Sequence, residues 1–188
     1  MKKLILASIL SAATLSAVAA PVTYNVDPSH TYASFEINHL GFSTQRGSFQ
    51  KTDGVITLDQ EKKTGSVDIT IDTASLNTGW AARDKHLTSE DFFNVGKFPT
   101  MTFKSKSFKF DGDKLSSVSG DFTLLGVTKP LTLNVSAFKC APHPMSKKPT
   151  CGADAVATIK RSEFGMAAYV PAVSDEVTLR IQVEASAK

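Results

Sequence analysis

The residues best placed to do chemistry lie between Thr78 and Phe93, in a segment that holds the only tryptophan of the chain. Arg83 and Asp84 are adjacent there, and His86 follows Arg83 by three residues, which puts both side chains near one face of a helix. Such groups could transfer protons or hold the polar end of a ligand. Arg83 and Asp84 could instead form an ordinary surface ion pair, which contributes little to stability.

No sequence template for catalysis accompanies this cluster. The chain has neither a Gly-x-Ser-x-Gly motif nor a phosphate-binding glycine loop. Its histidines are not spaced as a metal-binding pair such as i, i+4. A Ser-His-Asp triad is recognised by geometry and not by content, so the mere presence of these residues predicts nothing. We therefore expect no enzymatic activity, no metal and no cofactor. The histidines are His30, His39, His86 and His143.

His39 has two interpretations. It falls on the same face of a predicted strand as Phe35 and Ile37, so it points inward if they do. It is then either a core histidine satisfied by a backbone carbonyl or hydroxyl, or a polar group that holds the head of an apolar ligand.

The cysteines, Cys140 and Cys151, flank a segment with three prolines that is a poor strand and a good loop. In an oxidising compartment two cysteines so close in sequence most simply form a disulfide. Together with His143 and Met145 they are also soft-metal ligands that suit copper. A disulfide would remove both thiolates, so we favour the structural bridge.

The first residues predict export. Lys2 and Lys3 precede an apolar run that is too short to span a bilayer, and Ala17-Val18-Ala19 is a cleavage site of small residues. We predict a signal peptide at residues 1–19 and a single domain at residues 20–188. No later segment is long and apolar enough for a transmembrane helix.

The charge of the mature chain excludes partners that bind through electrostatics. The full chain has 21 basic and 18 acidic residues, and loss of Lys2 and Lys3 leaves a net charge near +1. No basic patch remains for nucleic acid or an anionic membrane surface.

The elements that must position the cluster are strands. Apolar and polar residues alternate with a period of two over most of the chain, and Asp-Gly, Thr-Gly and similar turn residues separate the runs. Eight or nine strands with short connections predict an antiparallel barrel or sandwich. The expected strands are Tyr32–His39, Phe42–Gln50, Gly54–Asp59, Val67–Asp72, Met101–Phe110, Gly120–Leu125, Leu131–Ala137, Ala153–Arg161 and Val177–Ala185.

The segment between these strands predicts two short helical pieces. Thr78 can cap a helix that begins near Trp80, and Thr88-Ser89-Glu90-Asp91 is typical of a second helix start before Phe92. Gly96 and Pro99 would end it. The two pieces are too small for a core of their own, so we interpret them as a lid.

The phenylalanines are the second clue to function. The chain has twelve, and most are expected to fill the core. An eight-stranded barrel, however, either fills with side chains or leaves room for one small ligand. Phenylalanine and methionine give such a cavity an apolar wall.

A series of motifs resembles the YceI-like polyisoprenoid-binding proteins, in the same order and over essentially the whole mature chain. The motifs include Asp27-Pro28-Ser29-His30, His39-Leu40-Gly41, Gly47-Ser48-Phe49, Arg83-Asp84-Lys85-His86-Leu87, Asp91-Phe92-Phe93, Gly120-Asp121-Phe122-Thr123-Leu124 and Arg161-Ser162-Glu163-Phe164-Gly165-Met166. The resemblance implies an all-β, lipocalin-like, eight-stranded antiparallel β-barrel with a short helical insert. It also implies a periplasmic location in a Gram-negative bacterium, no assigned reaction, and an apolar cavity that holds an isoprenoid or other long-chain lipid. The cysteine pair resembles a subgroup linked to an isoprenoid quinone such as ubiquinone.

These expectations assign residues to a lipid site. We predict that His39, Arg83, Asp84 and His86 face the head group or hold the lid. A homodimer is possible. The alternatives are a fatty-acid-type ligand, a barrel with a filled core that acts through its surface in stress or adhesion, and an enzyme that processes the bound lipid. The predicted cavity residues are Phe35, Ile37, Phe49, Phe92, Phe93, Phe103, Phe122, Leu124, Phe164 and Met166.

Overall fold

A computed structural model describes residues 20–188, and the predicted signal peptide at residues 1–19 lies outside the described residues. Within this range none of the helices is long and apolar enough to cross a bilayer. The elements are β1 (Val22–Val26), β2 (Tyr32–His39), β3 (Ser43–Phe49), β4 (Thr52–Asp59), β5 (Thr64–Asp72), a 3-10 turn η1 (Thr73–Ser75), β6 (Leu76–Asn77), α1 (Ala81–Leu87), β7 (Thr100–Asp111), β8 (Lys114–Leu124), β9 (Val127–Pro142), β10 (Pro149–Lys160), a 3-10 turn η2 (Arg161–Phe164) and β11 (Val173–Ala187).

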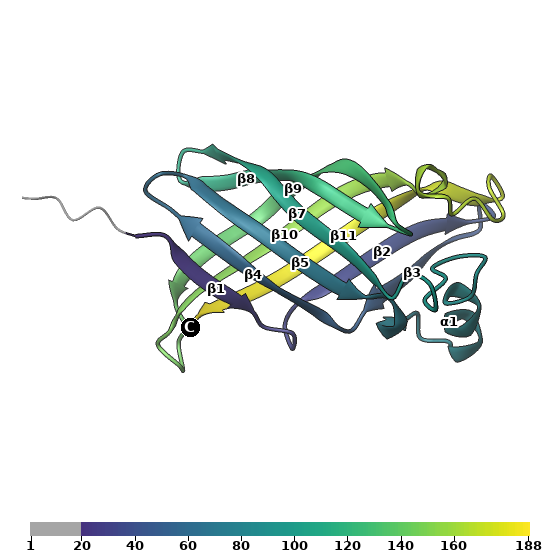
Figure 1. Ribbon diagram of the computed structural model, residues 1–188, viewed down its shortest axis with the longest axis horizontal. Coiled ribbons are helices and arrows are strands. Elements are labelled where there is room, and N and C mark those ends of the chain that lie inside the picture. Colours follow the sequence, from purple (N-terminus) through teal and green to yellow (C-terminus); the bar gives the residue numbers. More distant parts are fainter. Residues whose placement is uncertain (1–19) are drawn as a thin grey trace, which may run out of the picture.

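The strands form one closed antiparallel barrel (Figure 1). The order around the ring is β1-β4-β5-β7-β8-β9-β10-β11, and β11 returns to β1, with Tyr24 opposite Ala187. Each strand pairs with its neighbour in an up-and-down pattern. Inward and outward residues alternate along each strand except at the register shifts between β7 and β8, between β9 and β10, and between β2 and β11. The predicted eight-stranded antiparallel barrel is confirmed.

Three of the eight strands of the ring are each built from two shorter segments. β2 pairs with β11 beside β1, β3 pairs with β2, and β6 pairs with β3. The segments β1 and β2, β3 and β4, and β5 and β6 are therefore successive halves of bent strands. Strand β1, which precedes the first alternating run, was not predicted from the sequence.

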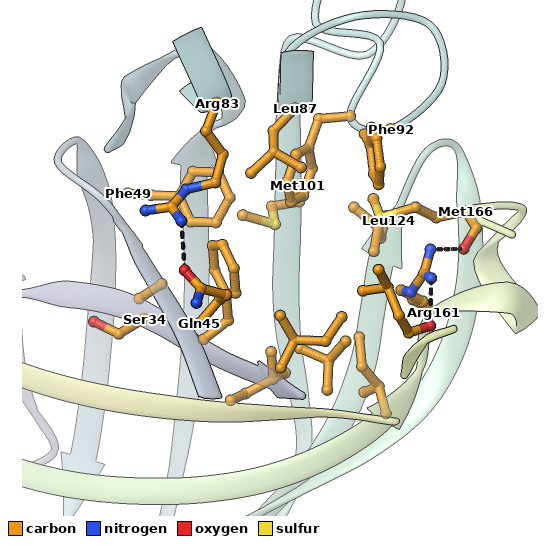
Figure 2. Close-up of a pocket in the computed structure, with 18 of the residues that line it drawn as sticks. Ser34, Gln45, Phe49, Arg83, Leu87, Phe92, Met101, Leu124, Arg161 and Met166 are labelled. Carbon is orange, nitrogen blue, oxygen red and sulfur yellow. Dashed lines mark hydrogen bonds between the residues drawn. The ribbon is translucent and has the colours of Figure 1, made fainter. Parts of the chain in front are cut away.

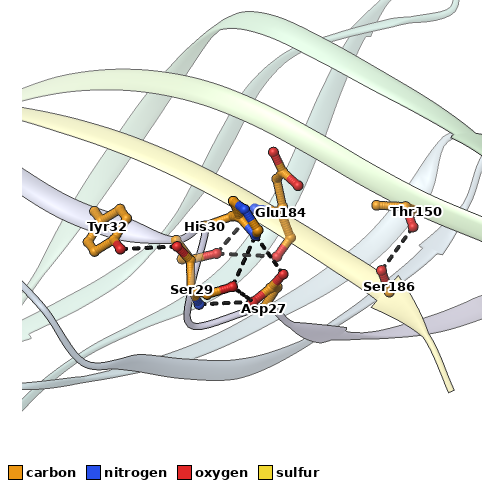
Figure 3. A network of polar contacts seen from close by, with 8 residues as sticks. Asp27, Ser29, His30, Tyr32, Thr150, Glu184 and Ser186 are labelled. Carbon is orange, nitrogen blue, oxygen red and sulfur yellow. Dashed lines mark hydrogen bonds and ion pairs between the residues drawn. The ribbon is translucent and has the colours of Figure 1, made fainter. Parts of the chain in front are cut away.

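Glu184 of β11 marks the bend between β1 and β2 (Figure 3). Its backbone carbonyl accepts hydrogen bonds from the Asp27 backbone N–H, at 2.8 Å, and from the Thr31 hydroxyl, at 3.2 Å. Its backbone N–H donates to the same hydroxyl at 3.1 Å. Thr31 is only 2% exposed, and its side chain replaces the ladder hydrogen bonds that the bend interrupts.

The turn at this bend carries an exposed titratable pair. The Ser29 hydroxyl and backbone N–H donate to the Asp27 carboxylate at 2.6 and 2.9 Å, and His30 Nδ1 lies 2.8 Å from the other oxygen (Figure 3). The hydrogen bonds from Ser29, followed by that from His30, lower the pKa of Asp27 to about 2. The hydrogen bond to Asp27 raises the pKa of His30.

This pair predicts a pH-dependent contribution to stability. The His30 contribution is complete below its unfolded pKa of 6.5 and is lost as the pH rises through the folded value. The Asp27 contribution is present above its unfolded pKa of 3.8 and is lost as the pH falls toward 2. We expect His30→Gln to lower the thermal unfolding temperature slightly at about pH 5 and less at about pH 8. An equal decrease at both pH values would contradict this linkage.

The helical insert is shorter than predicted. Only residues Ala81–Leu87 form a helix, and residues 88–99 form turns, so the predicted second helical piece is wrong. The Phe93 backbone N–H donates to the Leu87 carbonyl at 2.9 Å, and Asn94 adopts a left-handed conformation with φ of 43°. These turns bury the Phe93 side chain, which is 8% exposed, so tertiary packing overrides the local helix signal.

The predicted cap of the helix is also wrong. Trp80 occupies the cap position and makes no side-chain cap hydrogen bond. The Thr78 backbone N–H and hydroxyl instead donate to the Asp84 carboxylate at 2.8 and 2.5 Å. We call residues 78–99 the lid.

The barrel has two unlike ends (Figure 1). The β2–β3, β8–β9 and β10–β11 connections lie at the same end as the lid, which we call the mouth. The β4–β5, β7–β8 and β9–β10 connections and the C-terminus lie at the other end, which we call the far end.

Candidate functional site

The barrel encloses two apolar cavities. The larger, of about 410 Å³, lies at the mouth beneath the lid, and a smaller one of about 140 Å³ lies deeper. The volume of the outer cavity is in the range typical of small-molecule sites. The two cavities share wall residues, so they lie end to end in the barrel. The shared residues are Ala33, Ile71, Phe122, Leu179 and Ile181.

Strand alternation builds the cavity walls. On β11 the inward residues Val177, Leu179 and Ile181 line the outer cavity. The intervening Arg180 points outward, where its guanidinium lies 2.9 Å from the Glu36 carboxylate. The same period of two that predicted strands therefore separates an apolar interior from a charged exterior.

Most of the predicted cavity residues lie in the walls. Phe103 lines the inner cavity, and Phe122 lines both. Phe164 lines neither of the two cavities: it is 3% exposed and packs edge-on behind Phe122, with ring centroids 5.6 Å apart. Its predicted place in the wall is wrong because η2 turns its side chain behind that wall. The outer cavity is lined by Phe35, Ile37, Phe49, Phe92, Phe93, Phe122, Leu124 and Met166.

Arg83 joins the lid to the barrel (Figure 2). Its Nε donates to the Thr78 hydroxyl at 2.7 Å, one Nη donates to the Thr78 carbonyl at 2.6 Å, and the other Nη donates to the Gln45 side-chain oxygen of β3. Both Arg83 and Gln45 line the outer cavity. Asp84 does not: through Thr78 it holds the start of the lid.

Gly47 allows this close approach. A Cβ atom at Gly47 would lie 2.5 Å from the Phe35 ring and 2.9 Å from the Thr78 methyl group. Both distances are shorter than a normal contact between two carbon atoms, so no side chain fits at this position. The glycine therefore lets the Phe35 ring and the lid residue Thr78 both contact β3.

Aromatic contacts connect the lid to the opposite side of the mouth. The His86 ring meets the Phe92 ring edge-on with centroids 5.1 Å apart, and Phe92 stacks on Tyr169 of the β10–β11 connection at 6.1 Å. His86, Phe92 and Tyr169 all line the outer cavity. His39 also lines it, but its side chain is exposed at the end of β2, so it is a mouth residue and not a core histidine.

Arg161 is the one buried charged group of the cavity wall. It is 2% exposed, and its guanidinium donates to the backbone carbonyls of Ser174, Met166 and Val173 at 2.8 to 3.0 Å. Figure 2 shows the bond to Met166. Burial lowers its pKa, and the nearby Asp175 opposes this shift. The three hydrogen bonds fix the β10–β11 connection to the barrel.

Several residues of the cavity wall were not predicted from the sequence. Gln45 shares an inward face with Phe49, and Met101 shares one with Phe103, so alternation contained both signals. Arg161 and Tyr169 lie in irregular segments without a period, and nothing in their spacing placed them at the mouth.

The cysteines form the predicted disulfide at the far end. Cys140 and Cys151 are directly opposite each other on β9 and β10. The bond removes the two thiolates that a copper site would use, and His143 Nδ1 accepts instead from the backbone N–H groups of Met145 and Ser146. The copper alternative is therefore wrong.

The closed antiparallel barrel, with two adjoining apolar cavities beneath a short helical lid, defines a lipocalin-like binding barrel. Residues 24–185 match the model of the YceI-like domain, and the chain belongs to this family. It is 41% identical over 170 residues to Protein YceI of Escherichia coli O157:H7, covering 90% of this chain and 88% of that protein.

Solved structures agree with the fold. The Campylobacter jejuni YCEI protein is 34% identical with a TM-score of 0.69, over 80% of this chain and 90% of that one. Burkholderia cenocepacia BcnA is 25% identical with a TM-score of 0.73, over 85% and 98% of the two chains. A polyisoprenoid binding domain from Saccharophagus degradans is 17% identical with a TM-score of 0.67, over 89% and 99%, a likeness of fold alone.

Proposed function

We propose that this protein binds an isoprenoid lipid in the barrel and carries it through the periplasm. The ligand is an isoprenoid quinone such as ubiquinone, or a polyprenyl lipid. One observation carries the proposal: an apolar cavity opens at the mouth and adjoins a second apolar cavity deeper in the barrel. A long hydrocarbon chain with a small head group fits that shape.

The energetics favour such a ligand. Each buried methylene contributes about 0.8 kcal/mol, so one five-carbon isoprene unit contributes roughly 3 kcal/mol or more. Association and ordering costs reduce the measured affinity below that sum. A prenyl chain that enters the barrel loses its unfavourable contact with water, and the polar groups at the mouth remain for the head.

The comparison with solved structures supports the class of ligand, and the chemistry of the chain supports the compartment. The Saccharophagus degradans neighbour is described as a polyisoprenoid binding domain, so an isoprenoid is a ligand compatible with this fold. The predicted signal peptide and the disulfide favour an oxidising compartment outside the cytoplasm.

Binding without catalysis is also part of the proposal. A lipid-processing enzyme would need a base with a shifted pKa in the cavity. The carboxyl groups whose pKa is lowered, Asp27, Glu36, Asp59 and Asp175, lie outside both cavity linings. Arg161, whose pKa is lowered by burial, lines the outer cavity, but its guanidinium donates to three backbone carbonyls. The alternative of a filled core acting through its surface does not account for the two cavities.

Extraction of the native protein tests the proposal. The full chain, with its own signal peptide, is expressed in a Gram-negative host, purified from the periplasm and extracted with organic solvent for mass spectrometry. We expect an isoprenoid quinone or polyprenyl lipid in near-stoichiometric amount. Fatty acids alone would favour the fatty-acid alternative, and a protein free of lipid would contradict lipid carriage.

The lid predicts how fast such a ligand leaves. Arg83→Met removes the hydrogen bonds from Arg83 to Thr78 within the lid and the hydrogen bond from Arg83 to Gln45 of β3. Because the bond to Gln45 joins the lid to the barrel, the lid should open more often. We expect a fluorescent polyprenyl probe to dissociate about tenfold faster, which corresponds to the loss of about 1.4 kcal/mol. Lys85→Met, on the exposed side of the same helix, is the matched control and should release the probe at the wild-type rate. Equal rates for all three proteins would show that Arg83 does not hold the lid.

A further inference from the structure

Outside the lid, which carries charges of both signs, the connections at the two ends of the barrel differ in charge. Each far-end connection carries charged residues: Glu61, Lys62 and Lys63 between β4 and β5, Asp113 between β7 and β8, and Lys147 and Lys148 between β9 and β10. At the mouth, the β2–β3 connection at residues 40–42 and residues 165–172 before β11 carry none. Exposed connections normally carry polar and charged residues, so these two mouth connections depart from that pattern.

The exposed aromatic side chains of residues 20–188 all lie at the mouth. Phe42 is 88% exposed, Trp80 is 63% exposed and Tyr169 is 58% exposed. Each comes from a different connection: Phe42 from β2–β3, Trp80 from the lid and Tyr169 from β10–β11. Leu40, which is 50% exposed, lies beside Phe42. We call Leu40, Phe42, Trp80 and Tyr169 the rim.

Two residues of the rim have a strained backbone conformation. Leu40 has φ of 56° and Tyr169 has φ of 63°, in the left-handed region that favours glycine and asparagine. A glycine or asparagine at either position would adopt this conformation more easily and would expose less apolar surface to water. A large apolar side chain at a strained, exposed position indicates a surface that is covered during function.

We propose that the rim docks the mouth of the barrel onto the surface of a lipid bilayer. Tryptophan and tyrosine combine an apolar ring with a polar group, and they are enriched at the level of lipid head groups. The rim stands around the entrance of the outer cavity, which Leu40 and Tyr169 also line. A docked rim therefore places the cavity entrance against the hydrocarbon, so that a lipid chain can pass between the two without crossing water.

The chemistry of the rim selects one mode of attachment. The cations of the lid, Arg83, Lys85 and Lys97, are matched in number by Asp84, Glu90 and Asp91, and the other two connections of the rim bear no charge. The attraction therefore comes from apolar burial and not from anionic lipids. Docking is then nearly insensitive to salt and does not require anionic lipid. A flat protein partner is less favoured, because a stable protein interface needs a broad contiguous patch, whereas the rim consists of separate tips around an opening.

Trp80 is the only tryptophan of the chain and therefore reports docking directly. The experiment adds phosphatidylcholine vesicles to the full mature protein and records tryptophan emission, with and without brominated lipid. We expect a blue shift, quenching by the bromines, and the same affinity at low and high salt. Binding that occurs only with anionic lipid, or no binding at all, would overturn the proposal.

Two matched substitutions locate the contact. Phe42→Ser removes an exposed ring that lines neither cavity, and we expect about tenfold weaker vesicle binding. Met145→Ser changes a side chain that is 86% exposed at the far end, and it should bind vesicles as the wild type does. Equal binding by all three proteins, or equal loss in both variants, would overturn docking through the rim.

The rim could instead bind a second copy of the chain, which is the remaining outcome of the test. A blue shift that grows with protein concentration without vesicles, together with a dimer mass, would assign the rim to self-association and overturn the proposal. The inference rests on the proposed lipid carriage, but the two fail separately. Vesicle docking without extractable isoprenoid lipid would contradict only the carriage, and extractable lipid without docking would contradict only the rim.

Discussion

Leu179→Glu should abolish lipid retention while the barrel stays folded. Leu179 lies on β11 in the wall shared by both cavities. With the cavity open to water the carboxylate can be hydrated, but a prenyl chain would have to strip that water away. Desolvating an unpaired carboxylate costs several kcal/mol, so we expect lipid affinity to fall by about a hundredfold or more. Mass spectrometry of extracted protein and a binding titration measure the loss.

The neighbouring residue supplies the control. Thr178 is on the other face of the same strand, opposite Glu36, which is already paired with Arg46 and Arg180. Thr178→Glu adds the same charge to the same strand outside the cavity, and we expect it to retain lipid. Circular dichroism would verify that both variants fold. Lipid retained by a folded Leu179→Glu protein would place the hydrocarbon elsewhere.

Removal of the disulfide should cause the largest loss of stability. The bond joins residues eleven apart and restricts the unfolded chain. Without it the unfolded chain gains conformational entropy, which lowers the free energy of unfolding by about 3 kcal/mol. For a chain of this length we expect the Cys140→Ala, Cys151→Ala double variant to melt about 6–12 °C lower. Calorimetry on both proteins measures the shift.

A change in the same hairpin that spares the bond tests the cause. Lys147→Ser lies in the exposed turn between the two cysteines and should melt as the wild type does. Reductant should lower the melting temperature of the wild type toward that of the double variant and leave the variant unchanged. A double variant as stable as the wild type would contradict this account.

Sequence predicted the barrel because its strands are half-buried. The run Val177–Ala185 on β11 alternates apolar and polar residues, and this pattern can be read without knowledge of distant contacts. The bends between β1 and β2 and between β3 and β4 depend instead on tertiary partners such as Glu184 with Thr31. Those partners are far apart in the chain, so no local pattern reported the division into eleven segments.

The candidate site was predicted unevenly for the same reason. Phe35, Ile37 and Phe49 lie on regular strands, and their inward faces followed from alternation. Phe164 lies in η2, where the turn and not a period sets its direction, and its place behind Phe122 was missed. The composition of the lid indicated a site, but its single helix and the bond from Arg83 to Gln45 depend on contacts with β3.

The pairing of β11 with both β10 and β1 has a consequence for the order of folding. Its partners in β1 and β2 lie near the beginning of the described residues 20–188, so the ring closes only after nearly all of this segment is available. Contacts between such distant segments form slowly because a long loop must first be ordered. Until the last strand enters, the future cavity is an open, curved sheet with two free edges. A hydrocarbon guest can therefore be enclosed only at the final step of folding or afterwards through the mouth.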